Sequence, residues 1–477
     1  MPPQVLTPDL CVVGGGAAGF AVAAGAAAFG VSVVLIEQDG TGSDGRSTAR
    51  MPAQALLAAG RVAQTVREAA AFGIAAGRPR IDQARLRRHL DEVVTGIAPN
   101  LSAARLGALG VRVVAAQARF VDRTTIAAGD DLRVRARRTV LATGARPVLP
   151  GIDGLDAVPC LTTETICDLR SRPERLLVLG GGPDAVELAQ AQRRLGSEVT
   201  LVAPGALLPA VDPELAGHLA RALAAEGVIL RLSIRVQRVD TTAAGIVLTL
   251  ADGERISGTQ CLVAVGRRPA LDTLGLDAAG IAHDATGITV DASLRTSNAR
   301  VYAVGDCAAG PHGGERPAPV AGHQAAVVLQ AALFRQRARA ETQAVPRLVL
   351  TDPEIATIGL DEAAARAAGQ AVRIERWPFS ENDRARADRR TAGGIKLVLD
   401  RSGRILGAGI VGAHAGELIL PWVLAIRNRL DLADMRDVIV PWPSYSEVSP
   451  RAAFGFYTDL PRRPAIRRML RWLRLLG

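Results

Sequence analysis

The sequence predicts an α/β protein with two Rossmann-like domains and a C-terminal α+β domain. A glycine-rich strand–turn–helix pattern occurs near the N-terminus, and the same pattern returns later in the chain. After Ala340 the pattern changes to strands and helices without such a turn. The length of 477 residues suits about three domains.

The first pattern is a complete βαβ unit. Asp9 to Val13 is a strand, residues 14–19 read GGGAAG, an alanine-rich helix runs to about Phe29, and Val31 to Ile36 is a second strand that ends in Glu37. Glycines at such a turn let the backbone approach a pyrophosphate at the start of a helix. An acid at the end of the second strand suits a ribose hydroxyl. We therefore predict a dinucleotide site here.

The rest of the first block has both helical and strand-like periodicity. Helices are expected over Pro52–Phe72 and Ile81–Ile97, and strands over Val111–Val121 and Leu132–Leu141.

The second pattern begins with a strand from Leu176 to Leu179. Residues 180–185 read GGGPDA, a helix runs through Leu195, and Glu198–Val202 is the next strand. Alanine at the third glycine position is a tolerated variant. The duplication predicts two dinucleotide sites in one chain. No acid follows Val202, which favours NADPH over NADH as the coenzyme, because no carboxylate would repel a phosphate.

Charge and composition limit the classes of partner that we expect. The net charge is +10 and comes almost wholly from arginine, since Lys396 is the single lysine. This balance suits anionic ligands or an anionic membrane surface. Aromatic residues are only 3%, and no recognised nucleic-acid motif accompanies the charge, so we expect no nucleic-acid partner.

The five cysteines fall outside metal-type spacings, so no metal site is predicted. We interpret them as free thiols in a reducing cytoplasm. They are Cys11, Cys160, Cys167, Cys261 and Cys307.

The tail over residues 461–477 is predicted to be a basic amphipathic helix. Its apolar residues recur at helical spacing, and arginines lie on the opposite face. Such a helix suits the surface of an anionic membrane, which would place the protein at its inner face. The alternative is a helix docked on a partner subunit with its arginines solvated.

Several motifs together resemble the FAD-dependent pyridine nucleotide-disulfide oxidoreductases, such as dihydrolipoamide dehydrogenase and mercuric reductase. They are GGGAAG, LATGARP (141–147), AVGRRP (264–269), YAVGDC (302–307), TDPE (351–354) and WPSYSE (442–447). The resemblance implies a homodimer. It also implies an FAD-binding domain in two parts (1–150 and 266–340), an NAD(P)-binding domain (151–265), a dimerisation domain (341–460) and the separate tail.

The resemblance also implies which residues hold the cofactors. FAD would be bound by Gly14, Gly16, Gly19, Glu37, Ala118, Thr143, Gly144, Asp306 and Ala318. NADPH or NADH would be bound by Gly180, Gly182, Ala185, Glu187, Ala203, Gly266 and Arg267.

The sequence departs from the family where the disulfide chemistry is carried out. The two positions of the redox-active CxxxxC are Gly45 and Arg50, and the flavin-contacting lysine position is Gln54, although its glutamate partner survives as Glu187. The catalytic histidine position is Trp442.

These departures remove two chemical requirements. A dithiol needs two sulfurs within bonding reach, and a general base needs a group that titrates near neutral pH. We therefore predict an oxidoreductase that passes electrons from the nicotinamide through FAD to a small acceptor other than a disulfide, such as a quinone. Cys160 with Cys167, or Cys307, are the candidates for a substitute thiol, with packing as the alternative.

The predicted acceptor pocket spans two subunits. Trp442, Tyr445 and Glu447 would come from one chain, with Arg46 or Arg50 from the other. In this prediction Trp442, Glu447, Arg50 and Gln54 form the catalytic set. The alternative is that both arginines are solvated and that Glu447 accepts a hydrogen bond from the Trp442 indole.

Two other functions stay open at this point. One is a catalytically silent FAD-binding homologue with a structural or regulatory role. The other is a conventional dihydrolipoamide dehydrogenase or mercuric reductase, against which the missing cysteines argue.

Overall fold

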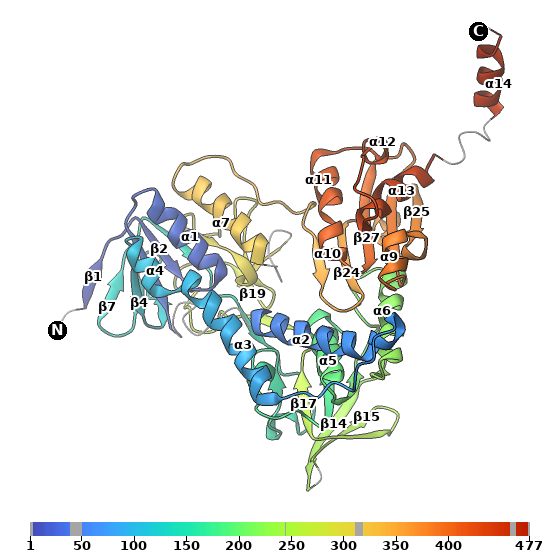
Figure 1. The fold of residues 1–477 in the computed structure, drawn as a ribbon. Coiled ribbons are helices and arrows are strands. Elements are labelled where there is room, and N and C mark those ends of the chain that lie inside the picture. Colours follow the sequence, from blue (N-terminus) through green and yellow to red (C-terminus); the bar gives the residue numbers. More distant parts are fainter. Residues whose placement is uncertain (1–2, 39–49, 244, 311–317, 458–463, 476–477) are drawn as a thin grey trace. The chain divides into compact units, whose positions relative to one another are not determined.

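The computed structural model describes residues 3–38, 50–243, 245–310, 318–457 and 464–475 (Figure 1). Contacts between residues divide the chain into two units. The first comprises Met1–Pro204 and Val228–Thr342, and the second comprises Gly205–Gly227 and Gln343–Gly477.

A parallel five-stranded sheet forms the core of the N-terminal part. Its order is β21 (Val301–Ala303), β8 (Arg138–Leu141), β2 (Leu10–Val13), β3 (Val33–Glu37) and β4 (Arg112–Ala115). Every residue of β2 is buried, as expected for a parallel sheet covered on both faces.

Two helices of this part pack closely together. Helix α1 (Ala17–Ala28) lies against α7 (Ala318–Ala332), and Figure 1 shows them side by side. A Cβ at Gly25 would come within 2.6 Å of Leu329 Cδ1, so a larger residue here would require the Leu329 side chain to shift.

A second parallel sheet repeats the arrangement. Its order is β10 (Leu161–Thr162), β17 (Gln260–Val263), β11 (Arg175–Leu179), β12 (Glu198–Val202) and β13 (Ile229–Arg231). Helix α5 (Pro183–Arg194) follows β11. The antiparallel sheet β14 (Val236–Thr242), β15 (Gly245–Leu250) and β16 (Arg255–Gly258) shares a hydrophobic core with it. Together the two parallel sheets confirm the predicted pair of Rossmann-like domains.

Short strands and two long helices complete this unit. The strands β9 (Ala145–Pro147) and β18 (Arg267–Pro269) pair with each other, so the two chain segments that pass between the sheets run antiparallel. Small sheets are formed by β1 (Gln4–Leu6), β7 (Leu132–Val134), β6 (Ile126–Ala128) and β5 (Ala118–Phe120), and by β19 (His283–Asp284), β20 (Gly287–Thr289) and β22 (Ala308–Ala309). The longer helices are α2 (Arg50–Glu68) and α3 (Gln83–Ile97), with the shorter α4 (Ala103–Ala108) after them.

The strand expected over Val111–Val121 is two strands. Its first part, β4, pairs with β3 in the parallel sheet, whereas its second part, β5, pairs with β6. The expected Leu132–Leu141 strand divides in the same way into β7 and β8. Neither run contains a glycine or proline at the break, so the sequence pattern alone could not locate it.

The second unit is built on an antiparallel five-stranded sheet. The order is β23 (Arg347–Val349), β24 (Glu354–Gly359), β27 (Ile405–Gly412), β26 (Gly394–Asp400) and β25 (Val372–Pro378). The helices that follow it are α10 (Ala415–Leu418), α11 (Leu420–Asn428), α12 (Leu432–Arg436) and α13 (Val448–Gly455). Its core includes fully buried Trp422, whose indole donates to Ser449 Oγ at 3.1 Å.

The second unit also holds a helix from the middle of the chain. Helix α6 (Pro213–Ala225) is joined to the sheet by Lys396 on β26. The Lys396 ammonium lies 2.8 Å from Asp212, 3.0 Å from Glu214 and 3.0 Å from Glu362, and its side chain is 7% exposed. A buried cation needs paired carboxylates, so this ion cluster fixes α6 against the sheet.

The tail contains the predicted helix, α14 (Pro464–Leu473). Several of its large apolar side chains are exposed, namely Met469, Leu470, Trp472 and Leu473. Among the described residues, none of the helices combines the length and the apolar character that crossing a bilayer requires.

Candidate functional site

The carboxyl ends of four parallel strands bring the predicted FAD-binding residues to one edge of the first sheet. Gly14 follows β2, Thr143 follows β8 and Glu37 ends β3. Asp306 follows β21, and a Cβ on the preceding Gly305 would lie 3.5 Å from Ala18 on α1. This edge is where ligands bind in open α/β sheets.

The three glycines of the first turn have different physical roles. Gly14 has φ +105°, and a Cβ there would lie 2.3 Å from the Ala142 carbonyl oxygen. A Cβ at Gly19 would lie 1.8 Å from the Gly14 carbonyl oxygen, so this glycine lets the helix pack on the turn. A Cβ at Gly16 would meet nothing within 4 Å. Gly16 therefore borders open space that a phosphate can enter.

The N-terminus of α1 also has no side chain that would occupy the place of a phosphate. Gly16 is the N-cap residue and supplies no side-chain hydrogen bond. By contrast, side chains cap α3 (Asp82), α4 (Ser102) and α6 (Asp212). Backbone N–H groups at a helix start that lack a side-chain acceptor attract anions.

Two polar side chains complete this edge. The Glu37 carboxylate accepts hydrogen bonds from the backbone N–H of Gly15 and, at 2.8 Å, of Gln38, so it lies beside the glycine turn. The Thr143 hydroxyl is buried beside the Cys307 thiol and has no oxygen or nitrogen hydrogen-bond partner among the described residues. A buried hydroxyl normally has a partner, and a bound nucleotide would supply one. The residues present therefore fit FAD.

The second turn repeats this geometry position by position. Gly180 has φ +130°, and a Cβ there would lie 2.2 Å from the Ala264 carbonyl oxygen, whereas a Cβ at Gly182 would meet nothing within 4 Å. Gly182 caps α5 without a side-chain bond, and Pro183 follows it. Ala185, in place of the third glycine, is fully buried. The residues here fit a second dinucleotide.

The position predicted to select between NADH and NADPH carries no charge. Ala203 follows β12, is buried, and its N–H donates to the Arg231 carbonyl oxygen at 2.9 Å. The Arg231 guanidinium is paired with Glu254 at 2.9 Å. Gly266 has φ +128°, and Arg267 after it donates to Glu164 at 2.8 Å and to the Ala145 carbonyl.

Comparison with known proteins agrees with this geometry. Residues 8–325 match the model of the pyridine nucleotide-disulphide oxidoreductases, and residues 345–453 match the dimerisation domain of that family. The chain belongs to the pyridine nucleotide-disulphide oxidoreductase family. Members of this family use FAD and NAD(P)H, so the protein is an FAD-dependent NAD(P)H oxidoreductase. Its dimerisation domain supports a homodimer.

Relatives match almost the whole oxidoreductase chain. Mercuric reductase of Streptomyces lividans is 32% identical over 464 residues, which cover 95% of this chain and 97% of the relative. Dihydrolipoyl dehydrogenase 2 of Haloarcula marismortui is 33% identical over 462 residues and covers 93% and 96%. The structure of LpdA from Mycobacterium tuberculosis superposes with a TM-score of 0.81 at 28% identity, over 93% of this chain and 98% of that one. That of the HOCl-induced flavoprotein disulfide reductase RclA from Escherichia coli has a TM-score of 0.82 at 25% identity, over 93% and 99%.

The segment where this family of oxidoreductases carries its redox cysteines is only partly described. Gly45 and Arg46 lie outside the described residues, as does the side chain of Arg50, the first residue of α2. Gln54 is half-buried on α2, and Glu187 is buried on α5. These two helices pack closely, since a Cβ at Gly60 would lie 3.4 Å from Ala191 Cα; Figure 1 shows them side by side.

The position of the family's catalytic histidine is an exposed indole. Trp442 is 72% exposed, and its Nε1 donates to Asp383 at 3.3 Å. Glu447 instead accepts from Arg451, one helical turn on, at 2.9 Å. The interpretation that Glu447 accepts from the Trp442 indole is therefore wrong. The neighbouring Tyr445 hydroxyl donates to Asp388 at 3.1 Å, and burial followed by this bond raises its pKa to about 12.

Two predicted cofactor residues lie in other elements of the oxidoreductase fold. Ala118 is the buried first residue of β5. Ala318 is the first residue of α7, and its side chain lies outside the described residues, as does that of Arg50. Gly144 has φ +67°, directly after Thr143.

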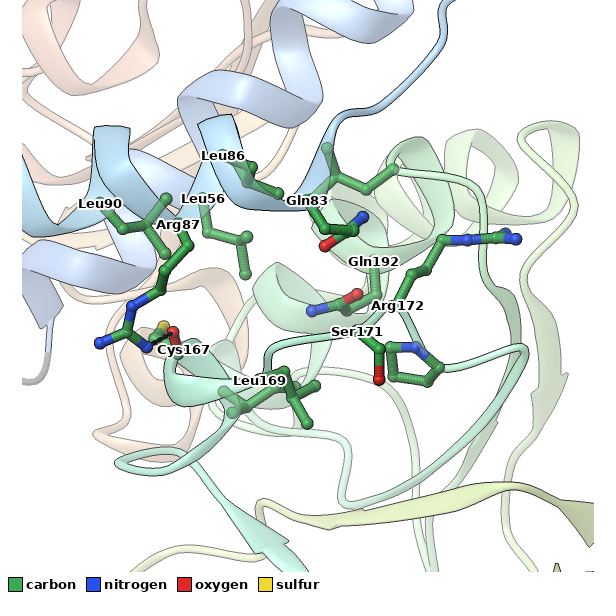
Figure 2. Close-up of a pocket in the computed structure, with 13 residues that line it drawn as sticks. Leu56, Gln83, Leu86, Arg87, Leu90, Cys167, Leu169, Ser171, Arg172 and Gln192 are labelled. Atoms are coloured by element: carbon green, nitrogen blue, oxygen red, sulfur yellow. Dashed lines mark hydrogen bonds between the residues drawn. The ribbon is translucent and has the colours of Figure 1, made fainter.

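The cleft next to Cys167 is too small for a cofactor. Its volume is about 20 Å³, and Figure 2 shows that Leu56, Leu90 and Gln192 line it with Arg87. Such a space holds about one water molecule. Arg87 Nη1 donates to the Cys167 carbonyl at 3.0 Å and lies 3.1 Å from Asp168.

Two of the thiols predicted as substitutes for the lost pair, Cys167 and Cys307, are buried. Burial raises the pKa of Cys167 to about 12. Cys307 is fully buried, its sulfur contacts the Leu141 carbonyl at 3.4 Å and the Val304 carbonyl at 3.2 Å, and burial raises its pKa. A nucleophilic thiol must ionise, so these environments favour packing over redox chemistry.

Proposed function

We propose that this oxidoreductase passes electrons from NADH or NADPH, by way of FAD, to a small acceptor that is not a disulfide. A quinone ring is the acceptor class that best suits an indole wall. The observation that carries the proposal is the replacement of both redox cysteines and the catalytic histidine, by Gly45, Arg50 and Trp442. When bound, FAD would supply hydride acceptance from the nicotinamide and electron delivery to the acceptor.

The chain's own residues have defined tasks in this proposal. Gly16 and the start of α1 would hold the FAD pyrophosphate, with Glu37 on the ribose, and Gly182 and the start of α5 would hold the coenzyme pyrophosphate. These assignments are supported by the open space at both glycines. Trp442 would offer the acceptor a flat apolar surface, which its exposed indole supports. Arg50 and Gln54 stay predicted members of the acceptor side, together with Glu447.

The decisive experiment follows bound flavin absorbance in anaerobic buffer. NADH or NADPH is expected to bleach the flavin, and a quinone is expected to restore its colour. Lipoamide, oxidised glutathione and mercuric ion are each expected to leave it bleached. Turnover of lipoamide at a substantial rate would refute the non-disulfide acceptor. A flavin that neither coenzyme bleaches would instead favour the catalytically silent homologue.

We further propose that α14 binds the surface of an anionic membrane. Residues 461–477 carry six arginines and no acid, and Trp472 with its apolar neighbours is exposed. Basic residues near such a surface contribute about 1 kcal/mol each. Deleting Arg462–Gly477 is expected to abolish co-sedimentation with phosphatidylserine vesicles while FAD is retained. Binding that persists after the deletion, or that is unaffected by high salt, would refute the proposal and favour a docked helix.

A further inference from the structure

Two cysteines that are far apart in the sequence lie side by side in the second parallel sheet. Cys160 directly precedes β10, and Cys261 is the second residue of β17. The two strands are parallel neighbours in which Leu161 is opposite Leu262. One step back in that register, Cys160 is opposite Cys261. Residues opposite each other in adjacent strands are about 4.8 Å apart, and their side chains lie on the same face.

The surroundings of the two thiols differ. Cys261 is fully buried in the core that includes Leu177 and Leu248, whereas Cys160 is half-buried at the edge of that core. The two thiols are close enough to influence each other's ionisation. The interaction with Cys261 lowers the pKa of Cys160, while the interaction with Cys160, followed by burial, raises the pKa of Cys261. The pair therefore consists of a half-buried thiol that ionises more readily and a fully buried thiol beside it.

This arrangement is separate from the proposed electron path. The glycine turn of the coenzyme site follows the carboxyl end of β11 at Leu179, whereas Cys160 and Cys261 lie level with Leu177 in the middle of that strand. The sulfur atoms face the core shared with the β14–β16 sheet. The pair is thus placed for a modification of the protein and not for direct exchange with a nicotinamide.

We propose that Cys160 and Cys261 form a reversible disulfide when the protein meets hydrogen peroxide. The Cys160 thiolate attacks one peroxide oxygen, the O–O bond breaks, and Cys160 sulfenic acid and water result after protonation. The Cys261 sulfur then attacks the Cys160 sulfur, the S–O bond breaks, and the Cys261 proton leaves with the hydroxide as a second water. Two thiols and one peroxide thus give one disulfide and two waters.

The backbone can accept this bond without a large movement. Disulfides form at Cα separations of about 4.4–6.8 Å, and the spacing of adjacent strands lies at the lower end of that range. The product would join β10, the edge strand of the sheet, to β17. Because Cys160 is only half-buried, thiols such as dithiothreitol should reach and reduce the bond.

The test is peptide mass spectrometry of the FAD-loaded protein after brief exposure to hydrogen peroxide and alkylation. We expect a peptide pair joined through Cys160 and Cys261, two hydrogens lighter than the sum of the free peptides, which dithiothreitol separates. Cys167→Ser is the matched control and should leave the pair unchanged.

Two variants separate the roles of the sulfurs. In Cys261→Ser the joined pair should be lost, and Cys160 should be trapped as a sulfenic acid by dimedone. In Cys160→Ser the remaining Cys261 should stay unmodified. The proposal is overturned if peroxide oxidises Cys160 without joining it to Cys261 in the unaltered protein, or if Cys160 stays fully alkylatable. Since the readout is covalent mass, its outcome is independent of which acceptor the flavin serves.

Discussion

Replacing Gly16 by valine tests whether the first glycine turn holds FAD. The backbone at Gly16 has φ −68° and ψ −176°, which valine adopts readily, and its Cβ would enter open space. The apoprotein should therefore fold normally, whereas the side chain would occupy the pyrophosphate position. Losing two backbone hydrogen bonds to a charged phosphate costs about 1.5–3 kcal/mol each, which corresponds to FAD binding weakened by about 10²- to 10⁴-fold.

The duplicated turn supplies a matched control. Gly182 has φ −80° and ψ 178° and also borders open space, so Gly182→Val makes the same change at the coenzyme site. We expect Gly16→Val to purify colourless with an unaltered apoprotein Tm. Gly182→Val should purify yellow, but its flavin should resist bleaching by NADH and NADPH. The reasoning is refuted if Gly16→Val retains a full complement of FAD, measured by the flavin-to-protein absorbance ratio, or if both variants lose FAD equally.

Three further predictions concern the second unit. Lys396→Met should lower the free energy of unfolding by about 3–5 kcal/mol, because it leaves the buried Asp212 carboxylate without its cation. A urea titration that shows a loss below about 1 kcal/mol would contradict this. Hydrogen bonds from Arg376 and then Lys396 hold the pKa of Glu214 at about 2, below its usual 4.5. The stability that ionised Glu214 contributes should therefore be fully present above pH 4.5 and be lost as the pH falls towards 2. In thermal melts, the Tm of the unaltered protein should fall more steeply over this pH range than the Tm of Glu214→Gln. Trp442→Ala should slow flavin reoxidation by a quinone about tenfold or more and leave reduction by NAD(P)H unchanged, and unchanged stopped-flow rates for both steps would remove Trp442 from the acceptor site.

The sequence was sufficient for the fold and for both nucleotide turns. Glycine spacing is set by local backbone geometry, so Gly14 and Gly180 could be assigned from their neighbours in the chain alone. The partners of side chains could not be assigned in this way. The Trp442 indole donates a hydrogen bond to Asp383 on another element, whereas the Glu447 carboxylate accepts one from Arg451, four residues later.

The cysteine pair was missed for a related reason. Only strand order and register make Cys160 a neighbour of Cys261, and the sequence does not specify that β10 pairs with β17. Pairing by proximity in the chain pointed to Cys167, which lies in a different element with a buried thiol. Predicting the strand order of the second sheet would have revealed that the two cysteines are neighbours.

The ion cluster around Lys396 has a consequence for synthesis and folding. Asp212 and Lys396 are 184 residues apart, yet they belong to the same unit. During translation α6 is synthesised long before the sheet that it joins. Its apolar face therefore has no sheet to pack against until the C-terminal part of the chain has been made. A fragment beginning at Gln343 would lack this helix and would leave Lys396 with fewer carboxylates. The C-terminal unit is therefore expected to fold late, and an excised version should be soluble only when residues 205–227 are supplied in trans or fused to it.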